Sequence, residues 1–494
     1  MSKRLRYLLV IGVFIISMAI VLTVLLLTQP KDEEESSDSS TSATISVLSY
    51  DRDNIATMTI KNENGEFTIR NGVSGFVIDE YSGFRQNSTT MGAAGRCVTS
   101  LNAQALVEEN AQDLSKYGLS DDSPKSSVTV TLKDGTSYTV YFGDDAPDGD
   151  TRYFRLSDSN TVYTVGLNSS GYFYYKADDF LSLIVTDELT NNNTAPTLDH
   201  LVIKRKDLDY DVEFVDDSKN YDADEIAAAS AQVMISPVYA YLDITNSTAI
   251  MYGLWGLTAS DIVKVYPTEE DFETYGLNDP FCEVILDAEL QHYHFRIGNV
   301  ASYTLDQNGE ETTDPYEYYC YYDGIDIIYT FTLSEIPFAN FMPIDILSPM
   351  MTSNYVLALD YIDIEYFGDD PASYYFELES DIEAAEMLSG TLNGEDFDTE
   401  EFKYLYQFIL KCPIDDLYFD EPGENNPLVA KIHFMRDDGA EDILEFYDIG
   451  SNRVCVKLNG HPSFSQPIGY LKVLRQNLDV FADGGTRDDL QEIW

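Results

Sequence analysis

The stretch YGLSDDSPKSSVTVTLKDGTSYTVYFG, residues 117–143, decides the fold of this chain. Residues 128–132 alternate apolar and polar side chains, residues 133–136 contain an Asp-Gly turn, and residues 138–143 alternate again. Alternation on both sides of such a turn is typical of a β-hairpin. The stretch therefore predicts two antiparallel strands that follow a Tyr-Gly-Leu segment.

The same arrangement occurs a second time in the chain. Tyr117-Gly118-Leu119-Ser120 recurs as Tyr275-Gly276-Leu277-Asn278, and a hairpin pattern follows each copy. The two copies are a whole domain length apart, which indicates a duplicated module rather than a solenoid. A ligand-contacting loop is one interpretation of Tyr-Gly-Leu. A helix end is favoured instead, with Gly left-handed and its two neighbours packed.

The order of predicted elements indicates an α+β fold built from tandem modules. Each module is an antiparallel sheet of hairpins with helices packed at one face. We expect modules at residues 45–190, 196–350 and 355–485, with predicted helices at 91–116, 227–234, 399–410 and 471–480. The third module lacks Tyr-Gly-Leu and has residues 413–418 in its place, so two modules followed by an unrelated domain remain the alternative.

An apolar segment near the N-terminus predicts a membrane anchor. Residues 7–27 carry no charge, and at 1.5 Å per residue they span a hydrocarbon core of about 30 Å. Lys3, Arg4 and Arg6 precede the segment, so residues 1–6 should stay in the cytoplasm and the bulk of the chain outside. A cleavable signal peptide is the alternative, but its apolar core would be shorter. Residues 28–44, rich in Ser, Thr and acids, form the expected linker.

The charge of the chain is strongly negative. Its 494 residues include 86 Asp and Glu against 30 Lys and Arg, a net charge of −56. Such a surface repels phosphate backbones, which argues against nucleic-acid binding. The charge can serve solubility in a salty exterior, or the acidic loops can capture cations; composition does not separate the two.

The motif order resembles an uncharacterised bacterial family, the domain of unknown function DUF4340. The resemblance is carried best by residues 116–165, through Tyr-Gly-Leu, the Lys-Asp-Gly turn and Phe142-Gly143-Asp144, and more loosely by residues 275–280 and 297–298. It implies an extracytoplasmic, membrane-anchored protein that accompanies ABC-type transport systems of the gliding-motility-auxiliary kind. It implies no catalytic residues.

Several side-chain groups are candidate sites. The acidic turn at residues 144–150 offers oxygen ligands for a hard cation but lacks the regular spacing of a calcium loop. His292 and His294 share one face of a predicted strand and could pair on a metal. In both places a solvated surface is the favoured interpretation. No nucleophile-elbow, P-loop or dinucleotide motif occurs, so we expect no catalytic, cofactor-binding or metal-binding residue and no enzymatic activity.

Two tyrosine-rich clusters, residues 172–175 and 316–322, could form a stacking platform for sugars or a partner, although core packing is favoured. The five cysteines, Cys97, Cys282, Cys320, Cys412 and Cys455, are scattered and odd in number, which indicates buried free thiols more than a disulfide framework.

These patterns favour an interaction protein. We expect a single-pass bacterial plasma-membrane protein that binds an ABC-type permease as an accessory component. The alternative is an extracellular module that binds cell-wall glycan through the tyrosine clusters. A wall hydrolase that uses acidic pairs is a third hypothesis, although no spacing singles out a pair. Oligomeric state stays open.

Overall fold

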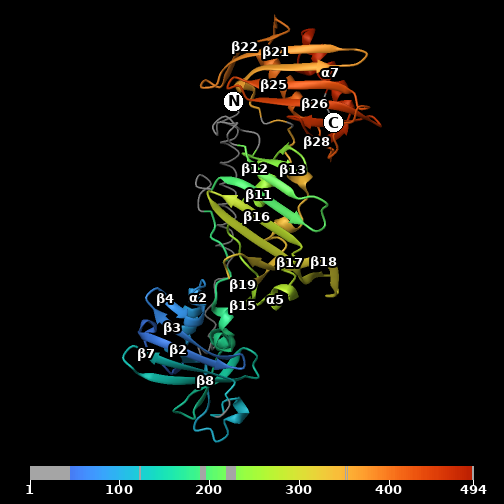
Figure 1. The fold of residues 1–494 in the computed structure, drawn as a ribbon. Coiled ribbons are helices and arrows are strands. Elements are labelled where there is room, and N and C mark those ends of the chain that lie inside the picture. Colours follow the sequence, from blue (N-terminus) through green and yellow to red (C-terminus); the bar gives the residue numbers. More distant parts are fainter. Residues whose placement is uncertain are drawn as a thin grey trace, which may run out of the picture. The chain divides into compact units, whose positions relative to one another are not determined.

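The computed structural model describes residues 45–121, 124–189, 196–217, 230–350, 352 and 354–491. The contacts of the chain divide it into two compact units. The first unit contains the chain up to Asn71 and Gly92–Tyr174, and the second contains Gly72–Met91 and Tyr175–Trp494. The described residues are mostly antiparallel β-sheet with a few helices (Figure 1).

Three large sheets share one strand order. The first runs β4-β3-β2-β7-β8-β9-β10-β6, the second β14-β13-β12-β11-β16-β17-β18-β19-β15, and the third β23-β22-β21-β20-β25-β26-β27-β28-β24. Strands β2, β11 and β20 therefore hold equivalent places, as do β8, β17 and β26. Since every neighbouring pair is antiparallel, the repeat of this order indicates three copies of one topology, while the exact module limits stay a prediction.

The strands of the first sheet are β2 (Ile55–Asn62), β3 (Gly65–Gly72), β4 (Gly75–Ile78), β6 (Ala105–Glu108), β7 (Ser126–Leu132), β8 (Ser137–Asp145), β9 (Thr151–Leu156) and β10 (Val162–Gly166). A separate two-stranded sheet pairs β1 (Ile45–Ser46) with β5 (Asn102–Ala103). The predicted Asp-Gly turn between β7 and β8 is confirmed: Asp134 accepts a hydrogen bond from the Thr136 amide at 2.8 Å, and Gly135 has a φ of 90°.

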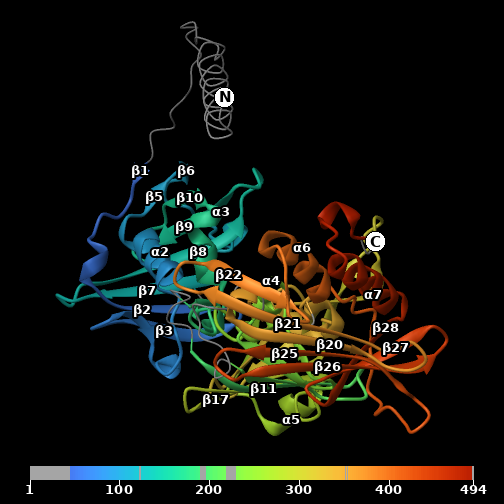
Figure 2. The same cartoon turned by 90° about the horizontal axis from the view of Figure 1, so that it is seen from above.

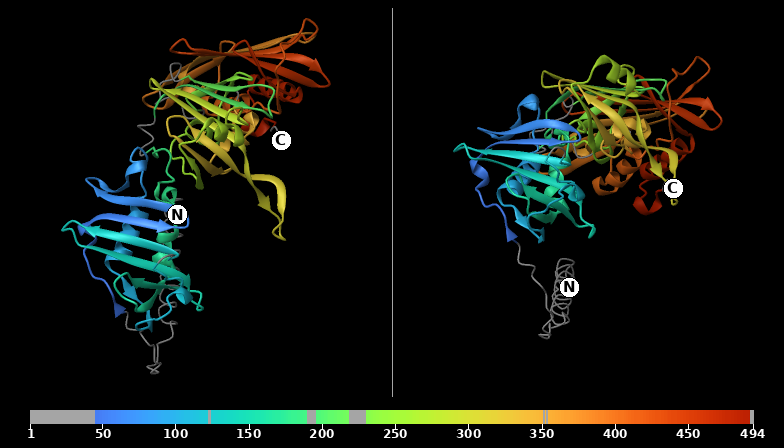
Figure 3. Two further views of the ribbon diagram at one scale, coloured as in Figure 1. Left: turned by 60° about the horizontal axis from the view of Figure 1, so that its bottom comes forward. Right: turned by 90° about the horizontal axis from the view of Figure 1, so that it is seen from below.

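The second sheet contains β11 (Leu198–Arg205), β12 (Val212–Asp216), β13 (Gln232–Ser236), β14 (Ala240–Tyr241), β15 (Asp261–Val265), β16 (Cys282–Ala288), β17 (Gln291–Leu305), β18 (Glu311–Tyr322) and β19 (Ile327–Thr332). Strands β17 and β18 form a long hairpin, drawn in yellow in Figure 3.

The third sheet contains β20 (Leu359–Tyr366), β21 (Ala372–Asp381), β22 (Glu386–Leu392), β23 (Glu395–Asp396), β24 (Asp416–Leu417), β25 (Leu428–Arg436), β26 (Glu441–Gly450), β27 (Arg453–Leu458) and β28 (His461–Pro467). Its predicted helices are confirmed as α6 (Thr399–Leu410) and α7 (Gly469–Ala482), which lie on one face of the sheet (Figure 2). Asp398 caps α6 by accepting from the amides of Glu400 and Glu401.

Each sheet is joined to a crossing segment by the polar residue at the end of its opening strand. Asn62 donates from Nδ2 to the carbonyl of Phe173 in η4 (Gly171–Tyr174). Arg205 donates to the carbonyl of Phe341, which lies between η8 (Pro337–Ala339) and η9 (Pro343–Ile346). Tyr366 donates to the carbonyl of Leu471 in α7. Asn62, Arg205 and Tyr366 thus have the same role in their sheets: each donates a hydrogen bond to a backbone carbonyl of the segment that crosses the sheet.

Two helix predictions were wrong in part. The helix predicted at 91–116 is α2 (Ser88–Thr99) only; after it the chain turns extended, because Ala105, Leu106 and Glu108 pair with β10. In the predicted helix at 227–234, residues 227–229 lie outside the described residues, and Gln232 onward is strand β13, hydrogen-bonded between β12 and β14. Sheet pairing overrode the local helix preference in both places.

The remaining helices are short: α3 (Leu167–Ser170), α4 (Ile244–Met251) and α5 (Glu269–Thr274). The predicted membrane segment at residues 7–27, the stub 1–6 and the linker up to 44 lie outside the described residues. Among the helices of the described ranges, none has the length and apolar character needed to cross a bilayer.

Candidate functional site

The Tyr-Gly-Leu segments are structural, as the favoured interpretation predicts. Gly118 ends η3 (Ser115–Tyr117) with φ 68°, and Gly276 follows α5 with φ 72°. Leu119 and Leu277 beside them are fully buried. Each segment lies so close to the sheet that a second glycine is required opposite it. A Cβ at Gly143 would lie 2.0 Å from the Tyr117 carbonyl oxygen, and one at Gly298 would lie 2.3 Å from the Tyr275 carbonyl oxygen.

A polar pocket lies beside this glycine contact in the first unit. It has a volume of about 680 Å³ and opens where β8 bends before the turn to β9. Its walls come from the ends of β2, β7, β8 and β9 and from η4; the charged lining residues are Lys61, Glu63, Asp121, Lys125, Asp144, Asp145 and Arg152.

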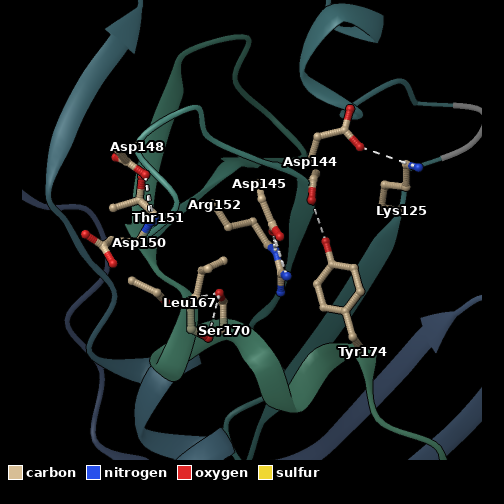
Figure 4. A network of polar contacts seen from close by, with 12 residues as sticks. Lys125, Asp144, Asp145, Asp148, Asp150, Thr151, Arg152, Leu167, Ser170 and Tyr174 are labelled. Carbon is tan, nitrogen blue, oxygen red and sulfur yellow. Dashed lines mark hydrogen bonds and ion pairs between the residues drawn. The ribbon is translucent and has the colours of Figure 1, made fainter. Parts of the chain in front are cut away.

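Ion pairs organise the pocket (Figure 4). Lys125 Nζ lies 3.4 Å from Asp144, and Arg152 lies 2.8 Å from Asp145. The Arg152 guanidinium also stacks 3.8 Å from the ring centre of Tyr174, whose hydroxyl donates to the Gly143 carbonyl at 2.6 Å. Burial raises the pKa of the Tyr174 phenol above its ordinary value, so it stays a donor at neutral pH.

Arg152 has donor capacity that the protein leaves unused. Its Nη1 is buried, and the described residues offer it no hydrogen-bond partner. Only 13% of the side chain is exposed, so this donor faces little bulk water. A buried guanidinium donor without a partner is costly, and an acceptor group brought by a bound molecule would satisfy it.

The equivalent places in the other sheets show that this pocket is particular to the first sheet. Lys125 precedes β7 and Arg152 lies in β9; counting along equivalent strands gives Phe281 and Tyr318 in the second sheet. Those two rings stack with centroids 5.7 Å apart and fill the space. In the third sheet the same count gives Val429 and Val454. Two sheets close this place with apolar side chains, whereas the first opens it with two cations.

The acidic turn at 144–150, the candidate metal site, does not gather its carboxylates. Asp144 and Asp145 point to Lys125 and Arg152, while Asp148 points the other way and accepts from Thr151 Oγ1 at 2.7 Å (Figure 4). That hydrogen bond holds the pKa of Asp148 below its usual range. Across the described ranges no three His, Cys, Asp or Glu side chains are grouped to hold a metal ion.

The paired histidines are each engaged by carboxylates. His292 Nδ1 lies 2.8 Å from Asp287, and His294 lies 3.1 Å from Asp323 and 3.3 Å from Glu283. These contacts hold both rings on the surface of the β16–β17 hairpin.

The tyrosine clusters are largely packed. Tyr318 and Tyr321 are 6% and 8% exposed, and the ring of Tyr319 packs 4.6 Å from that of Tyr275. In the other cluster one face of Tyr174 is covered by Arg152. Tyr316, which is 50% exposed, and Tyr175, which is 38% exposed, keep open surface. The favoured interpretation as core packing holds for these inner rings.

All five cysteines are free, and Cys282, Cys320, Cys412 and Cys455 are buried. Burial raises the pKa of the Cys282 thiol to about 12, and its Sγ faces the Phe338 carbonyl at 3.8 Å. Ser126 makes the same contact to the Phe173 carbonyl in the first sheet. Cys282 therefore serves as a small packed side chain under the Phe338 carbonyl.

Sequence reasoning missed two features. One is the Lys125 and Arg152 pair, which aligning the three hairpins would have exposed. The other is Asp442 in the second unit. It occupies an inward position of β26, is 2% exposed, and accepts from Tyr241, Asn354 and Asn459 at 2.7, 2.8 and 2.8 Å. Burial raises its pKa above the ordinary value. The sequence did contain a signal for this feature: Asp442 occupies a position of β26 where the alternation calls for a buried apolar residue.

Comparison with known proteins places part of this chain in a family. No curated protein and no solved structure matches it. Residues 77–280 match the family described as "Domain of unknown function (DUF4340)", a range that contains the pocket's β7, β8 and β9 and ends at the second Tyr-Gly-Leu. The chain thus carries a DUF4340 family domain at residues 77–280.

Proposed function

We propose that this protein is a non-enzymatic, single-pass membrane protein of the bacterial cell envelope whose extracytoplasmic sheets bind a membrane protein. The proposed partner is the permease of an ABC-type transport system of the gliding-motility-auxiliary kind. The anchor at residues 7–27 supports the location, and the family resemblance supports the choice of partner.

One observation carries the binding role. Of three sheets with the same strand order, only the first replaces a packed apolar pair by Lys125 and Arg152, and it thereby forms an open, charged pocket. A change confined to one copy, at the cost of a buried donor on Arg152, is typical of a surface that meets another molecule.

The pocket's chemistry also favours binding over catalysis. Its titratable groups are lysine, arginine and carboxylates joined in ion pairs, and Ser127 is the hydroxyl side chain that lines it beside two tyrosines. Nucleophilic catalysis needs a nucleophile within hydrogen-bond reach of a base. The contacts in the pocket are instead ion pairs, whose charged groups can exchange partners with a bound protein.

Crosslinking tests the proposal. The full-length protein is crosslinked in its native membrane, purified under denaturing conditions and identified with its adducts by mass spectrometry. Recovery of an ABC permease or its ATPase is the expected result. Recovery of this chain alone, or of wall polysaccharide in place of protein, would overturn it.

A further inference from the structure

The strand order of each sheet ends in an equivalent edge strand: β6 in the first sheet, β15 in the second and β24 in the third. An edge strand presents unpaired backbone groups, and proteins normally cover, shorten or charge such an edge to prevent unwanted pairing. The three copies therefore allow a direct comparison of how each edge is treated.

The edge of the second sheet is covered by the chain itself. The segment before β15 is paired with residues 183–187: the amide of Val185 donates to Leu257 at 2.8 Å, and that of Gly256 donates to Asp187 at 3.0 Å. On β15 itself, Lys176 Nζ donates to the Ile262 carbonyl at 3.4 Å. An exposed lysine, Lys264, adds a charge to this edge.

The edge of the third sheet is short and acidic. Strand β24 has only two residues, Asp416 and Leu417. Asp415 beside it forms an ion pair with Arg453. Such a strand offers little backbone for a visiting strand to pair with.

The edge of the first sheet has no covering segment within the described ranges and carries no lysine; its one irregularity is a bulge at Val107, because Leu106 pairs with Tyr163 and Glu108 pairs with Val162. Strand β6 is four residues long and reads Ala-Leu-Val-Glu, and it pairs with β10 alone within the described ranges. Leu106 is 42% exposed and Val107, the bulged residue, is 38% exposed. Its one charged residue, Glu108, is tied to Lys116 at 2.6 Å and Tyr117 at 2.7 Å.

We infer that β6 is a docking strand, to which an extended extracytoplasmic segment of the membrane partner adds as a further strand of the first sheet. This inference rests on the proposed function and adds a second surface, besides the Lys125 and Arg152 pocket, that holds the same partner. Strand addition gives affinity through main-chain hydrogen bonds and specificity through side-chain contacts, here those to the exposed Leu106 and Val107.

The position of β6 favours a partner in the same membrane. Strand β1, where the described chain begins, pairs with β5, and Ile45 lies opposite Ala103, two residues before β6 (Figure 2). The predicted linker, residues 28–44, spans at most about 60 Å when fully extended. Strand β6 is therefore tethered within reach of the short extracytoplasmic segments of a permease.

Charge argues against a second copy of this chain as the occupant. Two copies, each with a net charge of −56, repel one another. The segment that fits combines alternating apolar residues with lysine or arginine, which would be attracted to the acidic chain.

The test uses the full-length chain in its native membrane. A photoreactive residue replaces Val107, and a matched variant carries the same residue in place of Lys264 on the covered edge β15. Amide hydrogen exchange of residues 103–110 is measured in the membrane and after the partner is removed. The Leu106→Lys variant puts a charge on the strand, as β15 has, and Leu106→Val is its conservative control.

The expected result has three parts. The residue at 107 crosslinks to one contiguous segment of a membrane protein, the residue at 264 does not, and the amides of β6 exchange at least about tenfold more slowly with the partner bound. Leu106→Lys abolishes the crosslink and the protection, while Leu106→Val keeps both.

Other outcomes overturn the inference. They are a crosslink from 107 to a second copy or to residues 28–44 of the same chain, equal crosslinking from 264, or β6 amides that stay unprotected. A partner captured by general crosslinking but never from 107 would reject β6 and leave the proposed function standing. No partner from either method would reject both.

Discussion

In the first sheet Arg155 on β9 lies opposite Tyr141 on β8, with its guanidinium 4.5 Å from the ring centre. In the second sheet the residues at the same two places are exchanged: Arg296 is on β17 and Tyr321 is on β18, 5.8 Å apart. The third sheet has Glu445 opposite Lys457. The pair stays complementary in all three copies while its chemistry changes.

The difference between the cation–aromatic pairs of the first two sheets and the ion pair of the third follows from whether a Tyr-Gly-Leu segment covers the pair. In the first two sheets the Tyr-Gly-Leu segment lies over this face: Arg155 donates to the Leu119 carbonyl at 3.1 Å, and Tyr321 packs with Leu277. A cation stacked on an aromatic ring tolerates such a cover better than a bare ion pair does. The third sheet lacks Tyr-Gly-Leu, and there Lys457 reaches the exposed Glu421 at 2.7 Å. Tyr447 also stands where the other sheets need Gly143 and Gly298.

The largest expected effect comes from placing a side chain at Gly143, where the Tyr-Gly-Leu segment touches the sheet. Gly143→Ala forces the Tyr117 segment away from β8 and should lower the free energy of unfolding of the first sheet by about 3 kcal/mol. Gly171→Ala is the matched control, because Gly171 has a helical φ of −56° and open space around its Cα, so it should change stability by less than about 1 kcal/mol. Hydrogen exchange of β7 amides measures both. Equal losses of stability in the two variants would show that the close contact between Gly143 and the Tyr117 carbonyl does not require a glycine.

The buried arginine should come next. Arg155→Met leaves the carbonyls of Leu119, Leu156 and Ser159 without this donor and should cost about 2–3 kcal/mol. Arg296→Met should cost only about 1 kcal/mol, because that side chain is 26% exposed.

The swapped order of arginine and tyrosine found in the second sheet can be introduced into the first sheet by mutation. Combining Tyr141→Arg with Arg155→Tyr reproduces the order of the second sheet and should recover at least about 1 kcal/mol relative to Arg155→Met. Hydrogen exchange of β7 and β8 amides measures the variants of the first sheet, and exchange of β16 and β17 amides measures Arg296→Met. No recovery would mean that the position, not the pair, determines stability.

A smaller effect concerns the pH dependence of stability, which Asp442 should give to the second unit. The raised pKa of Asp442 means that the folded second unit holds this proton more tightly than the unfolded chain does. Stability from this group is therefore greatest below the ordinary carboxyl pKa of about 3.9 and falls as pH rises through the folded value. Tyr241, Asn354, Asn459 and Arg436 are the groups that face it. Asp442→Asn should flatten this part of the pH dependence of urea unfolding, and an unchanged slope would contradict it.

The smallest expected effect is none. Because Asp144 and Asp145 pair with cations and Asp148 turns to Thr151, calcium at millimolar concentration should leave the melting temperature of the full-length protein unchanged. Asp148→Asn serves as the comparison. A calcium-dependent rise that Asp148→Asn removes would restore the acidic turn as a cation site.

Strands with strict alternation were predictable from sequence. Strand β7 (Ser126–Leu132) alternates buried and partly buried residues and contains the predicted stretch 128–132. Strand β27 (Arg453–Leu458), a short apolar run, and helix α6 (Thr399–Leu410) have the expected bounds, because the local pattern there agrees with the tertiary packing. Strand β6 was predicted as helix, since an alanine- and leucine-containing run carries no sign that the edge of β10 will pair with it.

The candidate site was harder to predict than the fold. Lys125 and Arg152 are far enough apart in sequence that only the pairing of β7, β8 and β9 brings them to one pocket. Each looks like an ordinary surface cation until it is set against Phe281 and Tyr318. The glycine contact could be predicted only in part. The sequence motif singles out Gly118 and Gly276, whereas the need for glycine at Gly143 and Gly298 follows only from how closely the backbone approaches them.

The central claim, that the first sheet departs from its copies in order to bind a membrane partner, can be tested by removing the departure. Lys125→Phe together with Arg152→Tyr gives the first sheet the stacked pair of the second. The measurement is the yield of partner crosslinked to full-length protein in native membranes, with β7 hydrogen exchange confirming that the sheet is folded. We predict a folded protein that has lost its partner; a folded double variant that captures the partner as well as the wild type would contradict the account.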